Sequence, residues 1–489
     1  MLLIFVVLIL VLAIGGAWFI AGMTPWAVST LDEDLTIMLL LWLTGVLFAN
    51  SIEKISFAAG PDLSLARIIW ILLAFVLFSR FVTGKNRLLS MTKVEIAMVV
   101  FVLLALASKL FLQSRSAELT DPGISKLLNG YVFPFSMFFI SKHVAYDAGK
   151  IRKIFIFVVW AGLYLSLTAL GEHFSSLHGF VFPRIIMDPN AGIHWGRARG
   201  PFLNAAANGT VLGMIFPVVL FLAIQEKAGS LLRKFSIGVS LLIPVALYFT
   251  YTRACWLGLI AAAVCMALFY PQIRKVFIIA AIGLAVLAAV KFTATSQDVG
   301  AARFRDQSPI YDRIYLNDVA WRMFFKKPIF GYGLDSFPHI SFHYFKKIKG
   351  VPYHALRGLV PHNTFLAVLV ELGVVGFLPL ILIYYFIFKN SVGHFFQRPR
   401  EDVFARGLVV VLLAMSGAYF LNMTLIDMRF FLFPNALFFI MAGMVAGSQQ
   451  RQALLESESR RREFRPGGSR TGQELQRATV NKMECDHAV

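Results

Sequence analysis

Residues 363–388 read NTFLAVLVELGVVGFLPLILIYYFIF, an apolar run that holds a single charged residue, Glu371. A helix needs about 20 mostly apolar residues to cross the hydrocarbon core of a bilayer. Runs of this kind recur along nearly the whole chain. Because unpaired backbone groups are intolerable in lipid, we expect each run to be a helix. A transmembrane β-barrel is excluded, since it would show segments of alternating polarity.

The apolar runs predict an all-α integral membrane protein with about 12–13 transmembrane helices. They lie at residues 2–22, 36–49, 66–82, 94–112, 129–141, 154–171, 203–224, 236–250, 254–270, 276–291, 363–388, 407–422 and 429–447. The second and fifth runs are short, which leaves a count of twelve open. The first run lacks the positive segment of a signal peptide, so we interpret it as a retained span.

Composition agrees with residence in a membrane. Of the 489 residues, 58% are hydrophobic and 15% are charged, whereas a soluble domain has about 25% charged residues. The net charge of +19 would suggest nucleic acid binding in a soluble protein. Here much of it lies in short loops, where it sets orientation, so we expect no nucleic acid partner. The three cysteines have the spacing of neither a disulfide framework nor a metal site.

Basic residues in the short loops predict the orientation of the chain. Clusters of Lys and Arg separate apolar runs at residues 85–93, 142–153, 227–234, 274–275 and 389–406. Counting the helices between them puts all the clusters on one side, which the positive-inside rule assigns to the cytoplasm. The N-terminus and the longer loops then lie outside.

Four regions follow from this topology. We expect an N-terminal transmembrane bundle at 1–292 with an external loop at 172–202, a large external loop at 293–362, C-terminal transmembrane helices at 363–447, and a disordered basic cytoplasmic tail at 448–489. Loops as long as 293–362 are commonly functional. Within it, residues 312–324 have the pattern of an amphipathic helix at the membrane interface, so the loop is expected to be partly helical.

Arg253 lies in a tight turn between two spans, on the side where basic residues are disfavoured. Charges at the membrane boundary are costly and usually face a cavity or a partner. A guanidinium fork suits phosphate oxygens through paired, charge-assisted hydrogen bonds. An arginine that reaches lipid headgroups explains the position equally well. Arg199, in the loop before the seventh run, is ambiguous in the same way.

His362 and Glu371 stand near the start of one span. Near positive charge the pKa of His362 should fall, leaving a neutral imidazole able to accept a proton near pH 7. The alternative is that His362 only caps the helix or packs against it. Glu371 is roughly 13–14 Å into the run at 1.5 Å per residue. A buried carboxylate needs a partner, so we expect an ion pair with a basic residue rather than a part in chemistry.

Four segments, taken in order, carry a resemblance to a known family. They are RARGPFLNAAANG at 197–209, TYTRACWLG at 250–258, WRMFFKKPIFGYGLDSF at 321–337 and PHNTFLAVLVELGVVG at 361–376. Together they resemble the O-antigen ligase and O-antigen polymerase superfamily of membrane glycosyltransferases (Wzy/WaaL type). The sequence departs from the family pattern at four positions, with alanine at 205, 206 and 254 and threonine at 252.

The resemblance implies a GT-C-like fold and metal-independent, inverting glycosyl transfer at the periplasmic face of the bacterial inner membrane. The donor would be a glycan on undecaprenyl diphosphate and the acceptor a sugar hydroxyl, with no cofactor. Carried over to this chain, His362 would be the general base, and Arg199 and Arg253 would hold the diphosphate. Secondary candidates for that role are Arg303, Arg305 and Arg313, although anchoring at the interface explains them nearly as well.

The family resemblance leaves the acceptor open. A polymerase would use another lipid-linked repeat and could work with a chain-length regulator, a ligase would use a lipid A core, and a protein oligosaccharyltransferase would use a protein side chain. A transporter or flippase for lipid-linked sugars is the alternative from another class. A carrier keeps its site near the midplane, whereas the candidate residues here cluster at one face. A third hypothesis is a family member that has lost catalysis and acts in assembly.

Overall fold

The computed structural model describes most of the chain. The described residues are 35–48, 64–112, 122–144, 146–275, 277–278, 308–346, 356–398 and 401–463. The predicted span at 2–22 lies outside them, as do all but two residues of the span at 276–291. Arg303 and Arg305 lie outside them as well, so the structure does not test those two candidates.

The described part of the chain is helical and has no β-strand. Its α-helices are α3 (Leu35–Leu47), α4 (Leu65–Val82), α5 (Lys93–Leu112), α6 (Pro122–Leu127), α7 (Phe133–His143), α8 (Ala148–His173), α9 (Ala205–Gln225), α10 (Leu231–Tyr248), α11 (Arg253–Phe269), α14 (Ser308–Lys326), α15 (Phe337–Ile340), α16 (Thr364–Gln397), α17 (Val403–Leu425) and α18 (Leu432–Glu463). Short 3-10 turns and one π-helical turn join them.

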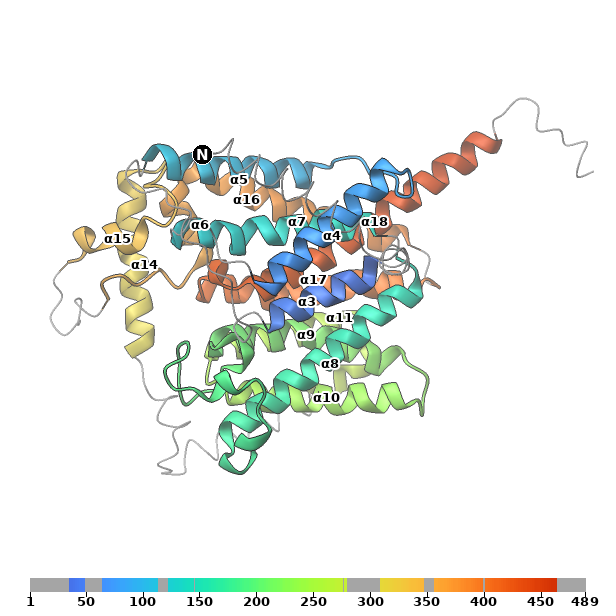
Figure 1. The fold of residues 1–489 in the computed structure, drawn as a ribbon, viewed down its shortest axis with the longest axis horizontal. Coiled ribbons are helices and arrows are strands. Elements are labelled where there is room, and N and C mark those ends of the chain that lie inside the picture. The colour runs from blue at the N-terminus through green and yellow to red at the C-terminus, as the bar shows by residue number, and fades with distance from the viewer. Residues whose placement is uncertain are drawn as a thin grey trace, which may run out of the picture.

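Most of the long helices run side by side, and α14 runs across one end of them (Figure 1). Eight of the described helices are long and apolar enough to cross a membrane, and α3 and α11 are shorter apolar helices. Each predicted run within the described residues coincides with a helix. The chain is therefore an all-α, multi-pass membrane protein, as predicted. The end of the bundle that is crossed by α14 is called the α14 end below.

The short run at 129–141 belongs to a longer helical segment than the sequence suggested. The π-helical turn η1 (Leu128–Val132) joins α6 to α7 without a break. The apolar run looked short because Lys126 interrupts it. This lysine is buried and forms an ion pair with Asp335, which explains how a basic residue is accommodated there.

The described helices of the N-terminal and C-terminal regions pack against one another. Helix α18 packs along α7, α17 along α11 and α16 along α5, so the N-terminal and C-terminal helices form one bundle. Helix α18 also continues to Glu463, past Gly447, where the sequence predicted a disordered tail. Arg451 helps to hold this extension, because it donates hydrogen bonds to the carbonyl oxygens of Lys142 (3.0 Å) and Val144 (2.6 Å).

Helix α16 is broken at Gly373, which has φ 64° and ψ −170°. The break leaves backbone groups without helical partners, and residues 328–333 supply new ones. The Val374 amide donates to the Pro328 carbonyl (2.9 Å), and the Gly333 amide donates to the Glu371 carbonyl (2.8 Å). Irregular backbone at membrane depth is tolerated where protein pairs it. Two of the four sequence motifs thus form one structural unit.

We predict that Gly373→Ala destabilises the protein by at least about 2 kcal/mol. The residue has a positive φ, and a Cβ atom would overlap the backbone of Ile329. Gly393→Ala on the same helix is the matched control, because no atom lies within 4 Å of a Cβ there. Thermal unfolding in detergent measures both variants. Equal melting temperatures for the two would contradict the proposed close approach.

Candidate active site

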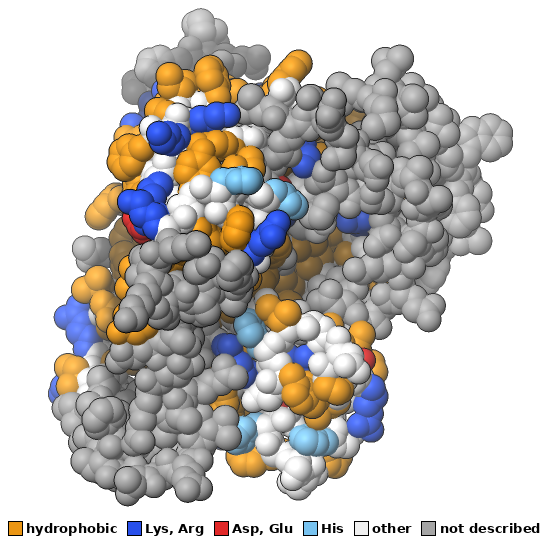
Figure 2. All heavy atoms as spheres, turned by 90° about the vertical axis from the view of Figure 1, so that its left-hand side faces the viewer, with side chains coloured by type: hydrophobic (Ala, Val, Ile, Leu, Met, Phe, Trp, Pro, Cys, Tyr) orange, Lys and Arg blue, Asp and Glu red, His pale blue; other side chains and the backbone are white. Residues whose placement is uncertain are grey.

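The α14 end is built on a small apolar core. Leu316, Val319 and Met323 of α14 pack with Leu366 and Val370 of α16. The predicted amphipathic helix at 312–324 therefore exists, and its apolar side packs on the first half of α16. Figure 2 looks onto this end and shows Lys, Arg and His side chains among the described residues there.

His362 precedes α16 and does not cap it. The cap is Asn363, whose side-chain oxygen accepts a hydrogen bond from the Leu366 amide (3.0 Å). The imidazole of His362 is half-buried. Burial lowers the pKa of His362, the positive charge of Arg313 lowers it further, and Asp427 acts in the opposite direction. The histidine is therefore held in its neutral form over a wider pH range than a free one.

Arg313 interacts electrostatically with both His362 and Arg253. Burial lowers the pKa of the Arg313 guanidinium, and the charge of Arg253 acts in the same direction. Both arginines are half-buried. The structure thus places Arg313 within electrostatic range of His362 and of the predicted donor residue Arg253, while the other two secondary candidates lie outside the described residues.

Arg197 supports the turn that carries Arg253. Its Nε donates a hydrogen bond to the Thr250 carbonyl (2.8 Å), and its Nη2 donates to the Thr252 hydroxyl. Tyr251 within the turn has a positive φ of 47°. The loop before α9 and the turn before α11 are therefore joined directly, which fixes where Arg253 begins its helix.

Arg199 occupies a different environment from the one predicted. Its side chain is fully buried, and its Nη2 donates hydrogen bonds to the carbonyl oxygens of Ile186 (2.6 Å) and Asp188 (3.0 Å). The carboxylate of Glu172 lies 4.0 Å from its Nε and accepts the backbone amides of Arg199 (2.9 Å) and Gly200 (2.7 Å). The guanidinium faces the interior of its own loop, because backbone carbonyls there need donors.

A buried ion cluster lies behind the site. Arg429 is 1% exposed and bonds to Glu371 (2.5 Å) and to Asp427 (2.7 Å). The expected ion pair of Glu371 is confirmed. Glu371 also accepts the backbone amide of Asp335 (2.8 Å), so the cluster reaches the loop after α14. Asp427 both binds Arg429 and acts electrostatically on His362.

Sequence reasoning missed Asp427 and Arg429. The signal was available, since a carboxylate deep in an apolar run requires a cation. Arg429 stands at the start of the last apolar run, 58 positions from Glu371. At that distance, sequence spacing gives no indication that the two residues are partners. Only the packing of α18 against the bundle brings the two together.

The arrangement combines an imidazole whose pKa is lowered with two guanidinium groups. Such a group of side chains can accept a proton from a hydroxyl and stabilise an anionic leaving group. Within the described ranges, no group of three or more His, Cys, Asp or Glu side chains is placed to hold a metal ion.

Comparison with known proteins identifies the central part of the chain. Residues 238–381 match the model of a protein family described as O-antigen ligase. The matched region contains Arg253, Arg313 and His362. A search of curated proteins gave no match. This match supports the resemblance of the chain to the O-antigen ligase/polymerase superfamily.

Proposed function

We propose that this protein transfers a glycan from a polyprenyl diphosphate, undecaprenyl diphosphate in bacteria, to a sugar hydroxyl. The observation that carries the proposal is the half-buried position of His362, where burial and the charge of Arg313 lower the pKa of the imidazole, with Arg313 in turn within electrostatic range of Arg253. All three residues lie in the O-antigen ligase domain. The reaction would take place at the α14 end, facing the periplasm, in the bacterial inner membrane.

The proposed chemistry is a single displacement. A nitrogen of His362 accepts the proton of the acceptor hydroxyl. At the same time, the oxygen of that hydroxyl attacks the anomeric carbon of the donor sugar. The bond from that carbon to the diphosphate oxygen breaks with inversion, and the electron pair leaves with the diphosphate. Arg253 and Arg313 stabilise the negative charge that develops there, so the mechanism needs no metal.

Arg199 has a different role in this proposal from the one its motif implies. Its enclosed guanidinium holds the loop before α9, which through Arg197 supports the turn that carries Arg253. We therefore assign diphosphate binding to Arg253 and Arg313, and loop positioning to Arg199.

The position of the site favours an enzyme over a transporter or flippase. Carriers bind their substrates near the membrane midplane between moving halves. Here the candidate residues lie at one end of the bundle, and helices from the two halves of the chain pack into one unit. A lipid-linked glycan donor and a glycan acceptor are the partners this implies. A lipid A core, a second lipid-linked repeat and a protein side chain remain the candidate acceptors.

We predict that His362→Ala lowers the rate of glycan transfer by about 10²–10⁴-fold without loss of membrane insertion. The loss is expected because no other group would accept the hydroxyl proton. Transfer from a synthetic polyprenyl-diphosphate glycan by purified protein measures it. His339→Ala is the control, because this histidine is exposed on α15. Full activity of the His362 variant would remove the base assignment.

We predict that Arg253→Lys lowers transfer by about 10²-fold or more, because a point charge does not reproduce the guanidinium fork. Arg274→Lys, beyond the other end of α11, should leave the rate unchanged, since Arg274 is exposed and bonds to carbonyls of its own helix end. The assay is the same. Normal turnover by the Arg253 variant would contradict the placement of the donor.

We predict that Arg313→Gln moves the acidic limb of kcat/KM to higher pH. In the wild type, burial and Arg313 lower the pKa of His362, so the limb should lie below about 6.5, the pKa of a free histidine. Removing the positive charge makes the imidazolium easier to form, which raises that pKa. A pH–rate profile of both proteins measures the shift. An acidic limb at the same pH in both proteins would show that Arg313 does not act on the pKa of His362.

A further inference from the structure

The C-terminal end of α14 exposes an apolar surface on the side of the helix that does not pack on α16. Trp321 and Phe325 are 45% and 73% exposed, and their rings stack with centres 5.9 Å apart. Ile329 and Phe330, just beyond the helix, are 57% and 63% exposed. A group of large apolar side chains this exposed marks an interaction surface. The segment, residues 321–330, is called the α14 tip below.

Backbone contacts place the tip beside the membrane-spanning part of α16. The Val375 amide donates a hydrogen bond to the Ile329 carbonyl (3.1 Å). Lys389, at the start of the basic cluster beyond the other end of the span, comes 14 residues after Val375, or roughly 21 Å along the helix. The hydrocarbon core of a bilayer is about 30 Å thick. Ile329 is therefore level with a part of α16 that lies within the hydrocarbon core.

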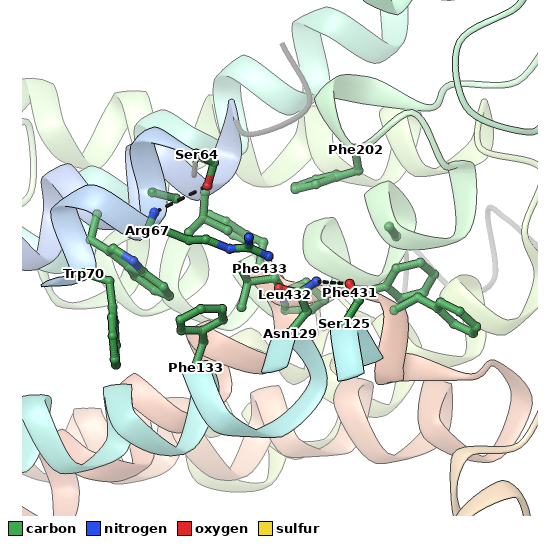
Figure 3. A pocket seen from close by; sticks show the side chains of 16 residues that line it. Ser64, Arg67, Trp70, Ser125, Asn129, Phe133, Phe202, Phe431, Leu432 and Phe433 are labelled. Atoms are coloured by element: carbon green, nitrogen blue, oxygen red, sulfur yellow. Dashed lines mark hydrogen bonds between the residues drawn. The ribbon is translucent and has the colours of Figure 1, made fainter. Parts of the chain in front are cut away.

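The tip continues the lipid-facing surface of α16. This helix is long and apolar enough to span a membrane, and Val374, Leu378 and Tyr385 are exposed on one side of it. The Val374 amide donates to the Pro328 carbonyl (2.9 Å), so the exposed part of the tip directly adjoins this surface. No residue of the tip lines the pocket of about 230 Å³ that lies between α3, α4 and α18 (Figure 3). The apolar surface of the tip thus belongs to the outside of the bundle.

Lys326 and Lys327 add positive charge beside the aromatic rings of the tip. Both lysines are exposed, and the Nζ atom of Lys327 lies 4.8 Å from the centre of the Tyr332 ring. The charge of the nearby Arg322 is compensated by an ion pair with Asp318 on the same helix. Aromatic side chains next to lysines are typical of segments at a membrane interface. Lysines at that depth attract anionic lipid headgroups.

We infer that the α14 tip inserts into the membrane leaflet on the α14 side and gathers anionic phospholipids there. Phe325, Ile329 and Phe330 contact the acyl chains, and Lys326 and Lys327 pair with the headgroup phosphates. The lipid thereby anchors the C-terminal end of α14. The inference does not depend on the proposed transferase reaction.

Fluorescence quenching in nanodiscs that hold one chain each tests the inference. The full chain carries a fluorophore on Phe330→Cys, in a background with Cys265→Ala and Cys485→Ala, while Cys255 is fully buried and stays. The discs consist of phosphatidylcholine with a small fraction of a lipid that has a nitroxide on its acyl chain, either phosphatidylcholine or phosphatidylglycerol. We expect the nitroxide lipids to quench the fluorophore and iodide in the water not to quench it.

Two other labelled positions are the controls. Leu378→Cys lies on the lipid-facing side of α16, so nitroxide lipids should quench its label. Glu456→Cys is exposed on the part of α18 that extends beyond the bundle (Figure 1), so iodide alone should quench its label. If Phe330→Cys does not fold, a label on Phe325→Cys gives the same measurement at the exposed end of α14.

The two lysines predict a preference for anionic lipid around the tip. At equal mole fraction, nitroxide phosphatidylglycerol should quench the tip label at least about twofold more strongly than nitroxide phosphatidylcholine. Lys326→Gln combined with Lys327→Gln should abolish this preference and leave quenching by phosphatidylcholine, since the apolar side chains still insert. Lys389→Gln should keep the preference, because Lys389 lies beyond the opposite end of the span.

Several outcomes would overturn the inference. Quenching by iodide alone at the tip position would place the tip in water, where it would meet a glycan or a soluble partner instead of lipid. Quenching by neither agent would show that protein covers the tip. Equal quenching by the two nitroxide lipids, or a preference that survives the removal of both lysines, would refute the role of Lys326 and Lys327.

Discussion

The break in α16 at Gly373 requires every nearby backbone group to find a partner within the protein. Residues 328–333 provide these partners, and this pairing fixes the chain that follows α14 against the bundle. Because α14 is tied down at its C-terminal end and packs on the first half of α16, Arg313 has a defined position relative to His362. Backbone pairing at one glycine therefore helps to position the α14 side of the candidate site.

The ion cluster of Arg429 reinforces the same region. Breaking a buried ion pair by removing one partner costs about 3–5 kcal/mol, because the remaining charge is uncompensated. Here one guanidinium holds Glu371 of α16 and Asp427 before α18, and Glu371 also receives an amide of the loop after α14. Three segments that are distant in sequence thus depend on one buried cation.

These constraints matter for chemistry because a leaving diphosphate is stabilised only by charges already in place. Preorganised donors aimed at developing charge can contribute several kcal/mol to the reduction of the barrier. Arginines on a loose loop would first have to be ordered. In this protein, Arg253 begins a helix whose preceding turn is held by Arg197, and Arg313 lies in a packed helix. In the proposed transfer, Arg253 and Arg313 both act from fixed positions near the imidazole of His362.

The sequence by itself determined the helices, because a run of about 20 apolar residues has one stable form in lipid. It also determined that Glu371 needs a cation, and it singled out Arg253 and His362 through their place at span ends. Tertiary structure alone decided that Arg429 is this cation, that Arg199 turns inward to carbonyls of its own loop, and that Arg313 acts electrostatically on His362. The physical reason is that hydropathy acts residue by residue along the chain, whereas the direction and partner of a charged side chain depend on segments packed from far away in sequence.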